Sequence, residues 1–112
     1  MQITHRTATE IAADNLAYET VKSDYELVGK WIIKIGVEEE SYPYEIFQKG
    51  ASYIGVVFQN GFKKESLEKR GNEFHVLNVE SGEFYQVDEN LEMTLFDKDG
   101  DLTEIGYEAI KV

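Results

Sequence analysis

Hydrophobic and polar residues alternate along the stretch from residue 27 to residue 37, which contains the only tryptophan. One face carries Leu27, Trp31, Ile33, Ile35 and Val37, and the other face carries Lys30, Ile32 and Lys34. Side chains of a β-strand alternate in this way, and β-branched and aromatic residues favour strands. The pattern therefore predicts a β-strand with one buried face.

Turn residues recur after this strand at a spacing of roughly ten residues, which is typical of short antiparallel strands joined by hairpins. The strongest of these signals is Asn60-Gly61, because both residues tolerate the positive φ of a tight hairpin turn. The further strands are predicted at 42–47, 52–58, 62–69, 74–79, 84–87, 91–96 and 102–110. We therefore expect an all-β fold, a small eight-stranded antiparallel meander barrel. Such a barrel is filled by its side chains or holds one small ligand. The pattern does not decide whether the barrel closes, or which face of 74–79 is inside.

A short α-helix is predicted before the barrel. Thr7 and Glu10 have the spacing of a capping box, and good or neutral helix formers continue to Lys22. The apolar stripe of this helix comprises Ala13, Leu16, Ala17 and Val21, and we expect it to pack on the strands. The 112 residues then form a single domain, 1–112, with a helix at 7–22 and a barrel at 25–112.

The charge and composition narrow the classes of function. The formal net charge of −11 disfavours nucleic-acid binding, because such a field repels phosphate backbones. The sequence contains no cysteine, no apolar core of signal-peptide length at its N-terminus and no run of membrane-spanning length. We therefore expect a cytoplasmic protein that neither enters a membrane nor forms disulfides.

The pair Gly29-x-Trp31, after a short helix and before a β-meander, resembles the lipocalin-like, or calycin, barrels. The segments Gly82–Tyr85, Asn90–Met93 and Asp97–Gly100 are similar to the closing hairpins of small bacterial lipocalin-like domains. The resemblance implies a barrel whose Trp31 packs over the closed end. The chain is shorter than a typical lipocalin and lacks the disulfide, which disfavours an extracellular carrier role.

The sequence contains no motif from which we expect catalysis or metal binding. Residues 97–108 resemble a calcium loop, but the sixth position requires Gly and carries Leu102, so we expect a hairpin turn. His5 and His75 have no ligand set at metal spacing, and His75 is expected on the face opposite to Phe74. We therefore predict no enzyme activity, no metal site and no cofactor.

The aromatic residues, seven Tyr, six Phe and one Trp, are the strongest functional signal. Those that face inward would line an apolar cavity with polar phenol tips, a composition typical of small-molecule pockets. The predicted ligand-binding residues are Trp31, Ile33, Tyr44, Tyr53, Phe58, Phe74, Tyr85 and Tyr107. The alternative is a solid aromatic core without a cavity.

Two functions follow from these features. The first is a non-enzymatic protein that holds a small, mostly apolar ligand inside the barrel. The second is an acidic inhibitor or immunity-type protein whose surface binds a basic protein partner, which predicts a filled barrel. An apolar outer face with Ile32 and Val57 would allow a homodimer in either case.

Overall fold

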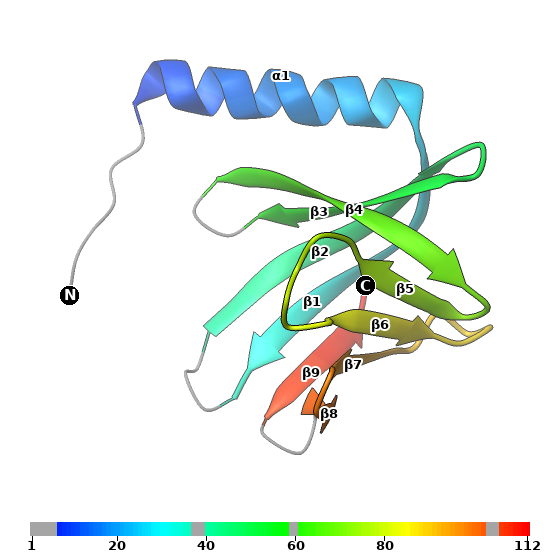
Figure 1. Ribbon diagram of the computed structural model, residues 1–112. Coiled ribbons are helices and arrows are strands. Elements are labelled where there is room, and N and C mark those ends of the chain that lie inside the picture. The colour runs from blue at the N-terminus through cyan, green and yellow to red at the C-terminus, as the bar shows by residue number, and fades with distance from the viewer. Residues whose placement is uncertain (1–6, 37–39, 59–60, 103–105) are drawn as a thin grey trace.

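The computed structural model describes residues 7–36, 40–58, 61–102 and 106–112 as one helix and nine antiparallel strands in a single curled sheet (Figure 1). The elements are α1 (Ala8–Asp24), β1 (Glu26–Ile35), β2 (Glu40–Lys49), β3 (Ser52–Phe58), β4 (Phe62–Arg70), β5 (Glu73–Val76), β6 (Phe84–Val87), β7 (Met93–Asp97), β8 (Gly100–Asp101) and β9 (Tyr107–Lys111). The predicted all-β fold with an N-terminal helix is confirmed.

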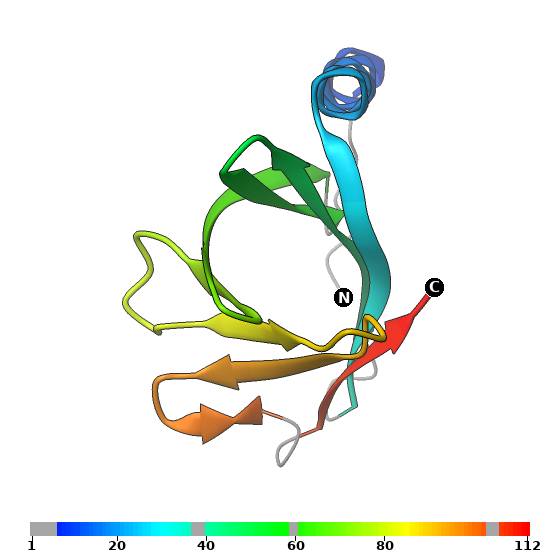
Figure 2. The same cartoon turned by 90° about the vertical axis from the view of Figure 1, so that its right-hand side faces the viewer.

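The sheet has the strand order β8-β7-β6-β5-β4-β3-β2-β1-β9 and curls into an open half-barrel (Figure 2). Each strand from β1 to β7 pairs with the next one in sequence, and β9 returns to pair with β1 from Trp31↔Lys111 to Ile35↔Tyr107. In the described part of the chain no ladder joins β8 to β9. The sheet has nine strands where eight were predicted, because β8 was not predicted, and the last strand begins at Tyr107 and not at 102. The architecture is compatible with a lipocalin-like fold.

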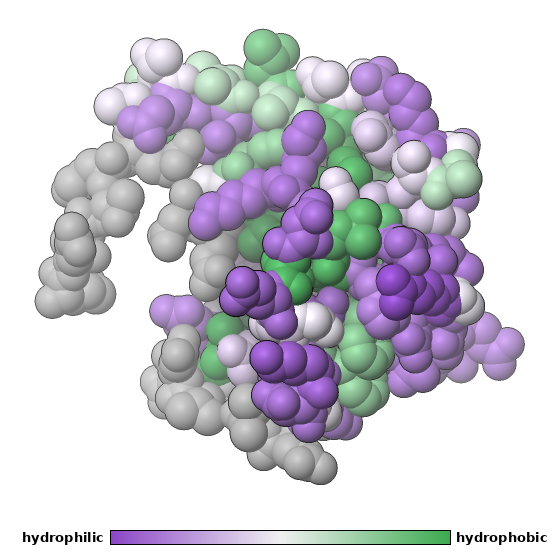
Figure 3. Space-filling model, viewed as in Figure 1, coloured by the Kyte–Doolittle hydropathy of each residue, from purple (hydrophilic) through white to green (hydrophobic). Residues whose placement is uncertain are grey.

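Helix α1 begins with the predicted capping box. The Glu10 N–H donates to the Thr7 hydroxyl oxygen at 3.1 Å, and the Thr7 N–H donates to the Glu10 carboxylate at 3.5 Å. The helix packs on the outer face of the sheet, where Tyr18 and Val21 contact a second apolar cluster that contains Phe47. The predicted contact of Leu16 is wrong, since this side chain is 70% exposed. In Figure 3, hydrophobic side chains are visible on the outer side of this helix.

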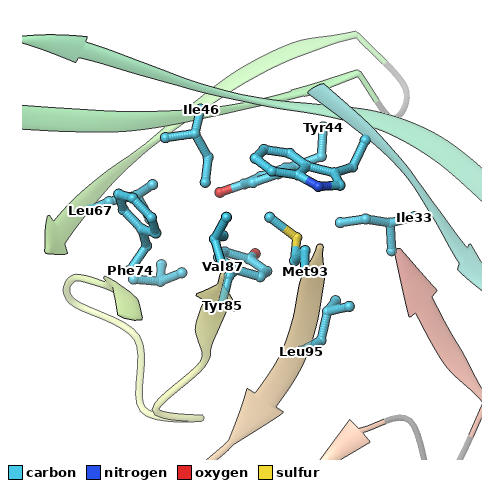
Figure 4. Packing of buried hydrophobic residues seen from close by; sticks show 11 residues of the cluster. Ile33, Tyr44, Ile46, Leu67, Phe74, Tyr85, Val87, Met93 and Leu95 are labelled. Atoms are coloured by element: carbon cyan, nitrogen blue, oxygen red, sulfur yellow. The ribbon is translucent and has the colours of Figure 1, made fainter. Parts of the chain in front are cut away.

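The main core lies inside the curl, where side chains from β1, β2 and β4–β7 point toward one another (Figure 4). Alternation places Trp31 and Ile33 here, both fully buried, as predicted. Leu27 was predicted on the same face but is 54% exposed. A register shift between Leu27 and Gly29 reverses the alternation at the start of β1, so Val28 packs against the core instead.

The sheet also shows which face of the segment 74–79 is inside. Phe74 and Val76 enter the core, whereas His75 lies on the outer face and stacks on Phe84 with ring centroids 4.6 Å apart. Strand β5 ends at Val76, earlier than predicted, and Asn78 adopts a left-handed backbone conformation with φ of 63°. The predicted turn residue Asn60 lies outside the described residues, although its flanking strands pair as expected.

Candidate functional site

The half-barrel is filled at one end, where β1 begins, β2 meets β3 and β6 meets β7. Trp31 closes this filled end: its indole covers Gly29, and its Nε1 donates a hydrogen bond to the Leu91 carbonyl oxygen at 2.7 Å. A Cβ at position 29 would lie within 2.5 Å of the ring, so only Gly permits this packing. The position of Trp31 agrees with the resemblance of Gly29-x-Trp31.

The opposite end, where β1 finishes and β2 begins, contains a cavity of about 230 Å³. Its walls combine aliphatic and aromatic side chains with one carboxylate. They are formed by Ile35, Tyr42, Glu83, Tyr85, Leu95, Phe96, Leu102 and Tyr107. A larger hollow of about 690 Å³ lies beside the turn between β2 and β3, where Gly50, Tyr53 and Leu67 are among its lining residues, and it is more open to solvent. The smaller cavity is the more enclosed of the two and belongs to the barrel interior.

Seven of the eight predicted ligand-binding residues lie in or against the interior core, namely Trp31, Ile33, Tyr44, Tyr53, Phe74, Tyr85 and Tyr107. Only Tyr85 and Tyr107 line the cavity, and the other five belong to the solid packing around it. Phe58 belongs to the cluster beneath α1, because Tyr53 and Val57 take the inner face of β3 and leave position 58 outside. The expectation that Val57 lies on the outer face is therefore wrong, since this side chain packs against the interior core.

A polar cluster lies deep in the interior behind the cavity wall. The Tyr85 hydroxyl donates to Glu65 Oε1 at 3.3 Å, and the Tyr44 and Tyr85 rings pack 4.9 Å apart at 44°. The Tyr44 hydroxyl lies close to both groups but is fully buried and makes no hydrogen bond of good geometry. Gly55 provides the space for this hydroxyl, which a Cβ at that position would overlap.

Burial raises the pKa of all four interior groups of this region. It raises the pKa of Tyr42 to about 12, and that of Tyr44 and Tyr85 well above 10, with the Glu65 carboxylate adding to each shift. Burial also raises the pKa of Glu65, while the Tyr85 hydroxyl, which donates to the carboxylate, opposes this shift. At neutral pH the phenols are therefore uncharged groups that can donate hydrogen bonds.

Sequence reasoning missed six cavity residues and Glu65. Tyr42 could have been found, since it shares a face with the predicted Tyr44, and Glu65 likewise shares a face with the inward Leu67. The missed cavity residues are Ile35, Tyr42, Glu83, Leu95, Phe96 and Leu102. The alternation of β7 assigns Leu95 to the inner face and therefore does not mark its neighbour Phe96.

The described residues of the calcium-loop match, and His75, make structural hydrogen bonds. Asp97 Oδ1 accepts hydrogen bonds from the Asp99 and Gly100 N–H groups at 2.8 and 3.0 Å, as in a hairpin turn. Residues 103–105 of the calcium-loop match, and His5, lie outside the described residues. The His75 ring is bonded to Glu73 at 2.8 Å. Within the described ranges no group of three or more His, Cys, Asp or Glu side chains could hold a metal ion.

Comparisons with protein-family models, with curated proteins and with solved structures found no significant match to this chain. Within the described residues no helix is both long and apolar enough to cross a bilayer. The interior cavity and the polar cluster behind it are the features from which a function can be inferred.

Proposed function

We propose that this protein is a non-enzymatic, lipocalin-like binding protein that holds one small ligand at the hollow end of the half-barrel. The observation that supports this function is the 230 Å³ cavity at the hollow end of the half-barrel. Its volume is below the roughly 300 Å³ at which typical drug-sized pockets begin, which suits a compact ligand. The alternative of an acidic inhibitor predicts a filled barrel, so the cavity favours ligand binding.

The cavity walls define the general shape of the ligand. Ile35, Leu95 and Leu102 offer aliphatic contact, and Tyr42 and Tyr107 add aromatic rings whose hydroxyls can bond a polar group. Because the lining exposes polar and apolar surface in similar amounts, we expect a ligand with both an apolar body and a polar group. The polar wall atoms would orient it.

A thermal-shift experiment with three phenyl-methyl probes tests the function. The probes are benzyl alcohol, benzylammonium and benzoate, which each carry a polar group one carbon from a phenyl ring and differ in charge. A probe that binds only the folded protein stabilises it by about 2.7 kcal/mol at a concentration of 100 Kd. We expect at least one probe to raise the melting temperature, and nuclear Overhauser contacts from its protons to the rings of Tyr42 and Tyr107.

A matched pair of variants locates the binding. Leu102→Trp fills the cavity from its wall, whereas Val79→Trp adds the same side chain at an exposed position outside it. We expect the melting-temperature shift to vanish in Leu102→Trp and to persist in Val79→Trp. The proposed function is wrong if none of the three probes binds the wild-type protein at millimolar concentration, or if Leu102→Trp binds as the wild type does.

A further inference from the structure

Two carboxylates at the hollow end have no cationic partner among the described side chains. Glu83 lines the cavity, and Glu65 lies behind Tyr85 in its wall. Glu65 accepts from the Tyr85 hydroxyl and Glu83 accepts from the Ser81 hydroxyl at 3.1 Å, so both bonds come from neutral donors. The ion pairs found in the described chain involve other carboxylates. Negative charge thus gathers at this end without a protein counter-charge.

Among the described lysines, none forms an ion pair with Glu65 or Glu83. Lys63 shares its face of β4 with Glu65, but it is exposed and has no ion pair within the described ranges. By contrast, the buried Glu45 on the outer face of β2 receives the Tyr18 hydroxyl at 3.1 Å and approaches Lys30 Nζ at 4.0 Å. The fold therefore supplies a cation to the buried carboxylate outside the curl and none to the pair inside it.

The Tyr44 hydroxyl is a second, independent observation. It is fully buried, lies beside the Glu65 carboxylate and makes no hydrogen bond of good geometry. Buried polar groups are normally satisfied, and an exception calls for an explanation such as a water, an ion or a bound group. Among the described residues the other such atom is Glu45 Oε1, on the outer face. A group bound near Glu65 would complete this unsatisfied cluster.

Aromatic rings surround the same space. Tyr42, Tyr85 and Tyr107 line the cavity, and the faces of such rings attract cations through their quadrupole. Aliphatic walls from Ile35 and Leu95 favour a cation with an apolar body over a hydrated inorganic ion. An anion is disfavoured, because Glu65 and Glu83 would repel it in a partly desolvated site.

We propose that the cavity selects a small organic cation, an ammonium group on an apolar body, which is recognised by Glu65, Glu83 and the surrounding tyrosines. This inference rests on the proposed function and specifies its ligand class. The ammonium group would take the position beside the carboxylates, and the apolar body would occupy the space between the aliphatic and aromatic walls.

Isothermal titration calorimetry with the three phenyl-methyl probes tests the charge preference at fixed ionic strength and pH 8. We expect benzylammonium to bind about tenfold more tightly than benzyl alcohol, and benzoate to bind most weakly. Glu65→Gln and Glu83→Gln should each weaken benzylammonium about tenfold, while benzyl alcohol changes little. Both substitutions keep the side-chain shape and an oxygen that accepts from Tyr85 or Ser81, so both variants should fold.

Glu26→Gln is the matched control, because it removes one negative charge from an exposed side chain at the filled end. It should leave the benzylammonium affinity within about twofold, since exposed charges at that distance are screened. Equal weakening in all three Gln variants would instead assign the attraction to the net charge of −11 and overturn the inference.

The remaining outcomes separate the two proposals. If benzyl alcohol binds as tightly as benzylammonium and Leu102→Trp abolishes both, the cavity is a binding site and the cation preference is wrong. If no probe binds, the proposed function and the inference fail together. Tighter binding of benzoate than of benzylammonium would overturn the inference alone.

Discussion

Replacing Gly55 with Ala should destabilise the protein strongly, because the inner face of β3 has no room for a methyl group at this position. The added Cβ would overlap the Tyr44 hydroxyl oxygen and would lie 2.7 Å from Tyr44 Cζ and 3.1 Å from Glu65 Cγ. Real Cβ atoms essentially never approach other heavy atoms within 3.0 Å. Either the tyrosine or the strand must therefore move.

The magnitude follows from how little either can move. Tyr44 is fully buried, and its ring is held against the Tyr85 ring at 4.9 Å. Gly55 is paired on both sides, with Ile46 on β2 and with Glu65 on β4. Overpacking a rigid core costs about 1–3 kcal/mol, and we expect the upper end of this range here. For a domain of this size the melting temperature should fall by about 10 °C.

Urea unfolding followed by the fluorescence of Trp31 gives the free energy of unfolding, since this residue is the only tryptophan and is fully buried. Gly50→Ala is the matched control, with nothing within 4 Å of the added Cβ but a φ of 60°. Its cost should be about 1 kcal/mol, from backbone strain alone. Comparing the two glycine substitutions thus separates the cost of steric overlap at Gly55 from the cost of backbone strain at Gly50.

The Tyr44→Phe background tests whether the hydroxyl is the obstacle. This substitution alone should change stability by less than about 1 kcal/mol, because the hydroxyl it removes lacks a well-formed hydrogen bond. Gly55→Ala should cost at least about 1 kcal/mol less in this background than in the wild type. The reasoning is refuted if Gly55→Ala costs no more than Gly50→Ala, or if the two substitutions at 44 and 55 are additive.

Three further predictions concern the end of the barrel, the helix and the alkaline limit. Trp31→Phe should cost about 2 kcal/mol or more in urea unfolding followed by circular dichroism, because it loses the bond to the Leu91 carbonyl and part of the core volume; a change under about 0.5 kcal/mol would contradict this. Thr7→Ala should lower stability by about 1 kcal/mol in far-ultraviolet circular dichroism melts, whereas Thr9→Ala inside the helix should not. Burial raises the pKa of Tyr42 to about 12, so its stabilising contribution is complete below pH 10 and is lost as the pH rises toward 12. Tyr42→Phe should therefore lose less stability than the wild type between pH 10 and pH 12, and parallel curves for the two proteins would refute the assignment.

The alternating pattern predicted the strands well, because each inner face needs apolar side chains at every second position. The sequence predicts the burial of Trp31 and Ile33 and the capping box at Thr7, because each depends only on residues two to four positions apart. The sequence does not predict the exposure of Leu27, because the bulge that turns this side chain to the other face depends on how β1 pairs with β2. Phe58 was misplaced for a similar reason, because Val57 is equally apolar and the alternation of β3 fits either choice.

The candidate site was less predictable than the fold, because a cavity depends on the volume that neighbouring strands leave empty. The sequence indicates that tyrosines face inward, and Tyr85 and Tyr107 do line the cavity. It does not indicate that Trp31 and Tyr44 fill their end while space remains beside Tyr42. That difference arises from the curl of the sheet and from the short β8 at its edge.

Substitutions at the filled end of the half-barrel should therefore affect stability, and substitutions at the hollow end should affect ligand binding. The filled end holds the fully buried Trp31 and its bond to Leu91, so substitutions there reduce the free energy of unfolding and leave the cavity walls unchanged. At the hollow end, burial makes the ionised form of Glu65 unfavourable, and Glu65→Gln relieves this cost. Glu65→Gln should thus keep or raise stability while it weakens a cationic probe, whereas Trp31→Phe should lower stability and leave the Kd of the folded protein unchanged. A variant pair that behaved in the opposite way would show that the buried carboxylate serves the fold, and that the cavity does not use it.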